Sequence, residues 1–387
     1  MGEAVELVSC CAWGNESLVL EAENVLGDQA VTVASLNAFT PEQLAERAEW
    51  NGQWGGFDWR PAPSAPDSVR PWIAAEEPGT SRTVFLPAEY VLIGLREAGD
   101  EDAGAIADSN GCASGPTHEA ARLRAVLELV ERDAAARWWY GRRSRPRLHI
   151  GRIGLPSEVA DVLVNRDRRT RVFDISTDLG ARVAAAASFR SDGRVVAHGF
   201  AARLSPAAAA RAALREMLAV ESTLPPWRSA ADAVAVAWLS KARASRHPLV
   251  GSAEIATDWA DGAETEGTGL SSLIDAAQRS KCRILFVDLT RPLVGVPVWR
   301  AVSPDLCTLR PRFGRLRLLA HDARDNPISR AGATKPKPAT AAPTKPAIAL
   351  AAIAIGPLGR NAPVASASKR SSRAARSPPS RATTSVR

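Results

Sequence analysis

The chain has 387 residues, enough for two or three average domains or for one large α/β unit, and 45% of them are hydrophobic. Its net charge of +7 is local, because residues 331–387 hold ten Lys/Arg and no Asp/Glu, leaving 39 basic and 42 acidic residues elsewhere. The rest of the chain, at −3, therefore lacks the basic surplus typical of nucleic-acid-binding proteins.

The spacing of the cysteines and histidines argues against a structural zinc site and against a disulfide framework. The five cysteines include no CxxC pair, and the five histidines stand apart, so we expect neither a structural zinc site nor a disulfide framework. No apolar run is long enough to span a membrane, and Met1 is not followed by a signal-peptide pattern. We therefore expect a cytoplasmic protein.

The first residues, MGEAVELVSCCA, predict a helix that carries Glu3 and Glu6 three positions apart. Between residues 36 and 72 the chain is rich in Trp, Pro and Gly, and the pattern predicts a short amphipathic helix after Thr40 and a loop over residues 61–71. Four tryptophans here, at 50, 54, 59 and 72, would suit a stacking platform for single-stranded nucleic acid, but no basic residues interleave with them. Packing in the core and in loops is the favoured use.

Residues 108–140 contain the strongest local signals. A turn rich in glycine is followed by Thr117, which is suited to cap a helix whose apolar residues recur at helical spacing from Ala121 to Trp138. Glu128, Glu131 and Arg132 interrupt that pattern and share one helix face.

Two interpretations of this charged face are open. It is either a solvated surface with an i,i+4 ion pair, or a site where the two carboxylates hold Mg²⁺ while the arginine meets phosphate oxygens. The Glu3–Glu6 pair repeats the same spacing and favours the second interpretation. Two such pairs could face each other across a nucleotide.

Further along, the pattern predicts a helix over residues 155–165 and three strands over 171–177, 181–189 and 194–202 that form an antiparallel meander. Ser205 and Pro206 then start a helix that carries Glu216. The polar stretch 239–269 predicts one helix, residues 272–280 a second, and residues 282–290 a buried strand. Asp288, Thr290 and Arg291 at its end either line a site or face water.

Several of these motifs resemble the YcaO domain, in particular the branch that makes thiazoline and oxazoline rings in ribosomally made peptides. The resemblance is carried by SNGCASGPTHEA and LELVERDAAARWWYGR, and by EAVE, which resembles the family's first metal-binding helix. In the same order as in the family, FLPAEYV, FDISTDLGARVAAAAS, ALREML and ILFVDLTRPLVGVPVWRAV resemble later motifs, so that residues 1–319 are covered.

The resemblance implies an α+β fold, with mixed and antiparallel sheets and helices that carry an ATP and magnesium site. We expect one YcaO domain over residues 1–320, N-terminally incomplete because family members have several tens of residues before the first helix. Residues 321–387 are expected to form a low-complexity, basic, disordered tail.

The resemblance also implies a function, namely ATP-dependent cyclodehydration of Cys, Ser or Thr in a precursor peptide. The substrate would supply the nucleophile, so no catalytic residue of the chain's own is expected. The implied metal ligands are Glu3, Glu6, Glu128 and Glu131. The implied ATP-binding residues are Ser109, Asn110, Ser114, Arg132, Arg211, Arg215 and Glu216. The implied partners are the peptide, a leader-peptide-binding protein, a flavin-dependent dehydrogenase and a second copy of the chain.

Three positions depart from the family pattern. Leu7 and Ala212 stand where an arginine is usual, and Ala219 stands where a glutamine is usual. We therefore expect weak ATP binding and little turnover by the chain alone, and a catalytically decayed scaffold remains an alternative. A nucleic-acid binder, suggested only by the basic tail, is a remote one.

Overall fold

We describe a computed structural model, which covers residues 2–56, 58–80, 82–141, 145–224, 239–244 and 269–319. The expected tail and most of the acidic stretch 239–269 lie outside these described residues. Within the described ranges, no helix combines the length and the apolarity needed to cross a membrane.

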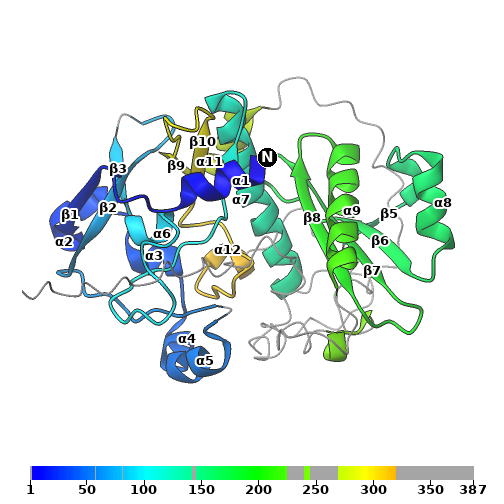
Figure 1. Cartoon of the computed structure of the whole chain (residues 1–387), viewed down its shortest axis with the longest axis horizontal. Coiled ribbons are helices and arrows are strands. Elements are labelled where there is room, and N and C mark those ends of the chain that lie inside the picture. Colours follow the sequence, from blue (N-terminus) through cyan, green and yellow to red (C-terminus); the bar gives the residue numbers. More distant parts are fainter. Residues whose placement is uncertain are drawn as a thin grey trace, which may run out of the picture.

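Two antiparallel sheets lie on either side of the long helix α7 (His118–Gly141), as Figure 1 shows. The first sheet has the order β1 (Leu18–Ala22), β2 (Val69–Glu76), β9 (Leu285–Asp288), β10 (Val298–Val302), β4 (Cys112–Ser114), and β3 (Thr83–Pro87) also pairs with β2. The second has the order β5 (Arg147–Leu148), β6 (Arg169–Asp174), β7 (Arg182–Phe189), β8 (Ala197–Arg203). The expected α+β architecture is confirmed.

Helix α7 forms as the sequence predicts and organises the largest core. The Oγ1 of Thr117 accepts a hydrogen bond from the backbone N–H of Ala120 at 3.1 Å, which caps the helix start. At the other end Trp138, only 1% exposed, packs against Phe173 and Phe200 of the second sheet with ring centroids 5.8 and 6.1 Å apart. The helix thereby links the cores of both sheets.

The predicted meander is confirmed as β6, β7 and β8, and α9 (Pro206–Thr223) covers one face of it (Figure 1). Ser205 caps α9 through a bond from the N–H of Ala208 at 3.3 Å. Gly199 lets helix and strand come close, because a Cβ there would lie 2.2 Å from the backbone N of Met217. Glu216, one residue earlier on α9, is thus held beside β8.

The N-terminal helix is also confirmed, as α1 (Gly2–Cys10). The other helical segments are α2 (Glu23–Leu26), η1 (Gly27–Gln29), α3 (Val33–Asn37), α4 (Pro41–Ala45), α5 (Arg47–Trp54), α6 (Ala88–Val91), η2 (Ile150–Arg152), α8 (Ser157–Asn165), α11 (Leu270–Arg279) and α12 (Leu316–Leu319). Thr40 caps α4 in a capping box with Gln43. The expected packing role of tryptophan is borne out by Trp50 and Trp72, which are 2% and 0% exposed.

Two expectations are wrong. The loop expected over residues 61–71 ends early, because β2 begins at Val69 and Pro71 lies in the strand, in register with Leu20 of β1. A disulfide joins Cys10, at the end of α1, to Cys112 in β4. These cysteines are 102 positions apart, so only the packing of α1 against β4 brings them together.

The charges at the end of β9 have a structural use. Arg291 forms a buried ion pair with Glu16 at 2.8 Å and donates to the carbonyl oxygens of Ser9 and Cys11. A cation at the C-terminal end of a helix is favourable, so Arg291 fixes the end of α1.

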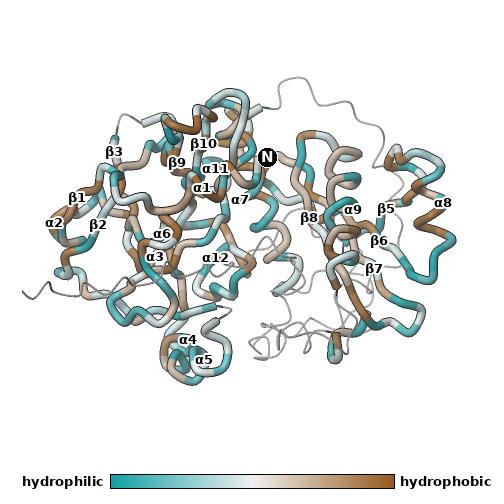
Figure 2. The backbone as a smooth tube through the Cα atoms, viewed as in Figure 1, coloured by the Kyte–Doolittle hydropathy of each residue, from teal (hydrophilic) through white to brown (hydrophobic). Residues whose placement is uncertain are grey.

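Figure 2 shows hydrophobic positions also at the two extremities of the molecule, in α2 and α8, where Val25 and Val164 are exposed.

Candidate nucleotide and metal site

Helix α7 places two carboxylates around one arginine. The Arg132 guanidinium lies 3.2 Å from Glu128 Oε1 and 3.2 Å from Glu131 Oε1. The side chains of Glu128, Glu131 and Arg132 are 25%, 11% and 10% exposed. This face of the helix is therefore not a solvated surface, and the ion pairs are too well buried to be incidental surface pairs.

Backbone amides orient both carboxylates. The N–H of Gly111, in the glycine turn, donates to Glu128 Oε2 at 3.2 Å, and the N–H of Ala202, in β8, donates to Glu131 Oε2 at 3.2 Å. Gly111 has a φ of +76°, and a Cβ there would lie 2.2 Å from the carbonyl oxygen of Ala301. The turn that holds Glu128 therefore requires glycine.

Glu216 joins the cluster from the opposite helix. Its Oε2 accepts the N–H of Phe200 at 2.9 Å, two residues along β8 from the amide that holds Glu131. Since β8 is the last strand of its sheet, these two amides belong to a free edge. Glu131 from α7 and Glu216 from α9 occupy that edge together.

The site carries more negative charge than its arginine balances. Burial raises the pKa of Glu128 to about 7; Arg132 opposes the shift, and the neighbouring Glu131 adds to it. Burial also raises the pKa of Glu131 and of Glu216, and the positive charge of Arg132 opposes both shifts. The negative charge of Glu216 raises the pKa of Glu131 further. A divalent cation would relieve this repulsion.

Magnesium fits this donor set, because it is usually bound by one or two carboxylates together with nucleotide phosphates. Among the residues that the structure describes, no group of three or more His, Cys, Asp or Glu side chains is arranged to hold a metal ion. Two α7 carboxylates completed by phosphate oxygens are therefore the fitting arrangement, rather than an all-protein cage.

The first helix contributes one of its two glutamates. Glu6 Oε1 accepts the N–H and the Oγ–H of Ser114 at 2.9 and 2.8 Å, whereas Glu3 is exposed at the start of α1. Arg124 of α7 donates to the carbonyl oxygen of Ser114 at 2.8 Å. Glu6 of α1 and Arg124 of α7 thus meet at Ser114 of β4, and no contact joins Glu6 to Glu128 or Glu131 among the described residues.

The other predicted residues are only partly brought together: Asn110 lines the same cavity as Arg132, whereas Arg211 and Arg215 do not line it. In the glycine turn, Asn110 donates twice to Asp108, and the carbonyl of Ser109 accepts the N–H of Cys112. On α9, Arg211 turns away to the carbonyl oxygen of Ile153 at 3.2 Å, and Arg215 is exposed.

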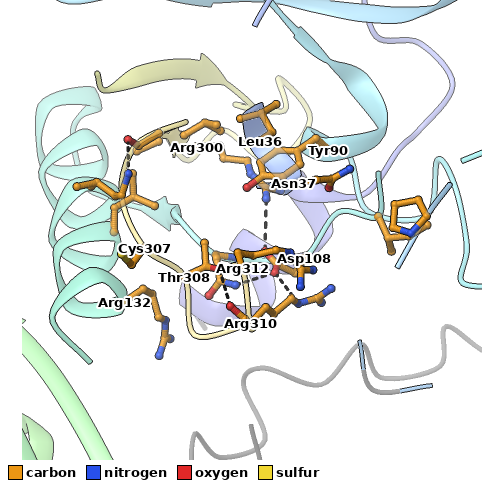
Figure 3. A pocket seen from close by; sticks show the side chains of 18 of the residues that line it. Leu36, Asn37, Tyr90, Asp108, Arg132, Arg300, Cys307, Thr308, Arg310 and Arg312 are labelled. Carbon is orange, nitrogen blue, oxygen red and sulfur yellow. Dashed lines mark hydrogen bonds and ion pairs between the residues drawn. The ribbon is translucent and has the colours of Figure 1, made fainter. Parts of the chain in front are cut away.

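A cavity of about 50 Å³ lies beside Arg132. Figure 3 shows Arg132 projecting from α7 at one side, with Asp108, Arg310 and Arg312 close together at another. Burial alone would raise the pKa of Asp108, but Arg310 at 3.2 Å and Arg300 at 3.5 Å hold it below its usual range. Sequence analysis missed these residues, although Asp108 directly precedes the glycine turn.

Comparisons with known proteins identify a family model and solved structures that this chain is similar to. A family model described as YcaO cyclodehydratase, ATP- and Mg²⁺-binding, matches residues 1–307. A solved heterocyclase in complex with substrate and cofactor has 28% identity and a TM-score of 0.75, covering 82% of this chain and 44% of that one. The heterocyclase TruD has 26% identity and a TM-score of 0.70, with 82% and 46% covered.

A curated sequence relative matches a shorter region. It is an uncharacterised protein in the tfuA 3′ region of Rhizobium leguminosarum bv. trifolii, 34% identical over 129 residues, which cover 30% of this chain and 29% of the relative. The chain spans less than half the length of the two solved heterocyclases and under a third of this relative.

Proposed function

Because the chain belongs to the YcaO family, whose members bind ATP and Mg²⁺, we propose that it activates backbone amides of a ribosomally made precursor peptide. The reaction is the cyclodehydration of Cys, Ser or Thr to a thiazoline or oxazoline. The observation that carries this proposal is the buried Glu128–Glu131–Arg132 cluster on α7, with Glu216 facing it across the edge of β8.

The chemistry explains why the site needs no nucleophile. The Cys, Ser or Thr side chain of the peptide loses its proton and adds to the carbonyl carbon of the preceding amide, which gives an oxyanion. That oxygen takes the γ-phosphoryl group of ATP, and ADP leaves. Phosphate then departs as the amide nitrogen loses its proton and the C=N bond of the ring forms. The protein has to position the phosphates and stabilise their charge.

Each residue of the cluster has a distinct part in this scheme. Glu128 and Glu131 would hold the Mg²⁺, which when bound neutralises phosphate charge during the transfer. Arg132, held between the two carboxylates, would meet the transferring phosphoryl group. The backbone amides of Gly111 and Ala202 fix the carboxylates before any ligand arrives, so little reorganisation is needed.

The adjoining cavity of about 50 Å³ has room for only a few water-sized groups, so we propose it for the reacting carbonyl of the acceptor and not for the peptide as a whole. It begins at Arg132 and is lined further on by Tyr90, Arg300 and Arg310. Cationic donors beside the phosphoryl group suit an acceptor whose carbonyl oxygen becomes an oxyanion. A solved heterocyclase with 28% identity is in complex with substrate and cofactor, which supports a substrate-binding role for this fold.

The partners proposed for this chain follow from the same family. They are the precursor peptide, a leader-peptide-binding protein, a flavin-dependent dehydrogenase that would oxidise the rings, and a second copy of the chain.

The test is mass spectrometry of a Cys-containing precursor peptide incubated with the chain, a leader-binding partner, ATP and Mg²⁺. Loss of one water per modified residue, with release of one phosphate per ring, is the expected result. Binding of MgATP without any product would favour the alternative of a catalytically decayed scaffold, motivated by Leu7, Ala212 and Ala219. Absence of both binding and product would refute the proposal.

A further inference from the structure

The end of β8 carries an arginine that the cluster described above does not include. Arg203 is the last residue of β8, and Arg182 lies directly opposite it on β7. Directly opposed residues of an antiparallel pair share one face, and like charges in that position are destabilising. In the part of the chain that the structure describes, neither arginine forms an ion pair that would offset this repulsion.

Arg203 lies beside the carboxylates without being paired to them. The only hydrogen bond of its side chain among the described residues runs from Nη1 to the carbonyl oxygen of its own neighbour Ala202 at 2.7 Å. The N–H of the same Ala202 donates to Glu131, so the Arg203 guanidinium and the Glu131 carboxylate are both bonded to the backbone of Ala202.

Helix α9 does not supply a cation here. Ala212, one turn before Glu216, is 9% exposed and packs in the core between α9 and the second sheet, and an alanine supplies no charge there. Arg211 is engaged with the carbonyl of Ile153, and Arg215 is exposed. A second cation beside Glu216 would therefore have to come from another element, and β8 carries Arg203.

We propose that Arg203, assisted by Arg182, binds the polyphosphate of the nucleotide that the α7 carboxylates hold through Mg²⁺. This inference rests on the proposed function and adds a phosphate-binding residue to it. An arginine has five N–H donors, and Arg203 uses one of them on Ala202, which leaves the rest of its fork for phosphate oxygens. A bound polyphosphate would also remove the repulsion between the two opposed arginines.

Arg203 would compensate for the departure at Ala212, because α9 packs against β8. A cation lost from a helix can be replaced by one from a neighbouring strand, provided that its guanidinium reaches the same phosphates. Glu131 contacts Arg132 through Oε1 and the N–H of Ala202, the residue before Arg203, through Oε2. The two arginines would therefore bind the phosphates from different elements, α7 and β8.

The test is isothermal titration calorimetry with MgATP, and separately with magnesium and inorganic triphosphate, on four proteins. These are the unmodified chain, Arg203→Gln, Arg203→Lys and the control Arg190→Gln, which removes an exposed arginine directly after β7. Arg203→Gln is expected to weaken both ligands by roughly 10- to 100-fold, the worth of a charge-assisted hydrogen bond to phosphate. Arg203→Lys should restore part of the loss, and Arg190→Gln should bind like the unmodified chain.

The outcomes separate this inference from the proposed function. MgATP binding that is equal in the unmodified chain and in Arg203→Gln overturns the role of Arg203 and leaves the proposed function standing. An equal loss of affinity in the control Arg190→Gln would show that only the net charge matters, and would also overturn the role of Arg203. No MgATP binding by the unmodified chain overturns both.

A structural role is tested by the melting temperature of each ligand-free protein. A lower melting temperature with unchanged affinity in the folded fraction would show that Arg203 only supports the fold. Should Arg203→Gln fail to fold, Arg203→Lys and Arg182→Gln decide the matter: each is expected to weaken triphosphate binding severalfold, and unchanged binding in both refutes the proposal.

Discussion

Substitution of Glu128 by Gln tests the electrostatics of the site most directly. In the folded protein burial raises the pKa of Glu128 to about 7, with Arg132 opposing, whereas an unfolded chain titrates near the ordinary value. The folded state therefore holds a proton that the unfolded state releases between these two values. The contribution of this bound proton to the free energy of unfolding is fully present below the pKa of Glu128 in the unfolded chain. That contribution is lost as the pH rises through the folded-state pKa of about 7.

The size of the effect follows from the same difference. A shift from the ordinary value of 4.5 to about 7 corresponds to about 3 kcal/mol of lost stability at pH 8. The attraction between Arg132 and the ionised Glu128 is already contained in this net shift. We expect ligand-free Glu128→Gln to be more stable than the unmodified chain by about 3 kcal/mol at pH 8, and no more stable at pH 4.

Urea denaturation at pH 4, 6 and 8 measures the stability, and calorimetry measures MgATP binding, which the variant should lose. Glu119→Gln is the matched control, because Glu119 is an exposed glutamate in the first turn of the same helix. A Glu128→Gln protein that is less stable than the unmodified chain at pH 8, or that binds MgATP equally well, would refute the reasoning.

Four further predictions concern the framework around the site. Gly111→Ala should cost at least about 3 kcal/mol in urea denaturation, because its Cβ would meet the Ala301 carbonyl, whereas Gly94→Ala, with open space around it, should cost about 1 kcal/mol. Arg291→Gln leaves Glu16 buried without its cation and should cost about 3 kcal/mol, with faster hydrogen exchange in α1; unchanged exchange would contradict the anchoring role. Alkylation of the unreduced, unfolded chain should modify three of the five cysteines, and modification of all five would rule out the disulfide. Deletion of residues 331–387 should leave the melting temperature unchanged, and loss of cooperative unfolding would show that this composition had been misjudged.

The sequence by itself determined the elements that depend on local signals. Thr117 and Ser205 cap helices that the spacing of apolar residues predicts from the sequence alone. Short turns between predicted strands likewise indicated the meander of β6, β7 and β8. The Glu128–Glu131–Arg132 face could be recognised for the same reason, since helical spacing alone puts these side chains together. Motif order then identified the family.

Only the tertiary structure decided what depends on contacts between distant segments. Glu131 and Glu216 meet because α7 and α9 both reach the free edge of β8, and neither helix carries a sign of that edge in its own sequence. Pro71 lies in a strand because pairing with β1 and β3 outweighs the loop-like composition around it. Arg203 ends a strand whose other residues are all buried, and its closeness to the site depends on Ala202 beside it and Arg182 opposite. The periodicity of a sequence predicts on which face of its own helix or strand a side chain lies. Only tertiary packing brings charged side chains from separate helices and strands close enough to bind the same ligand.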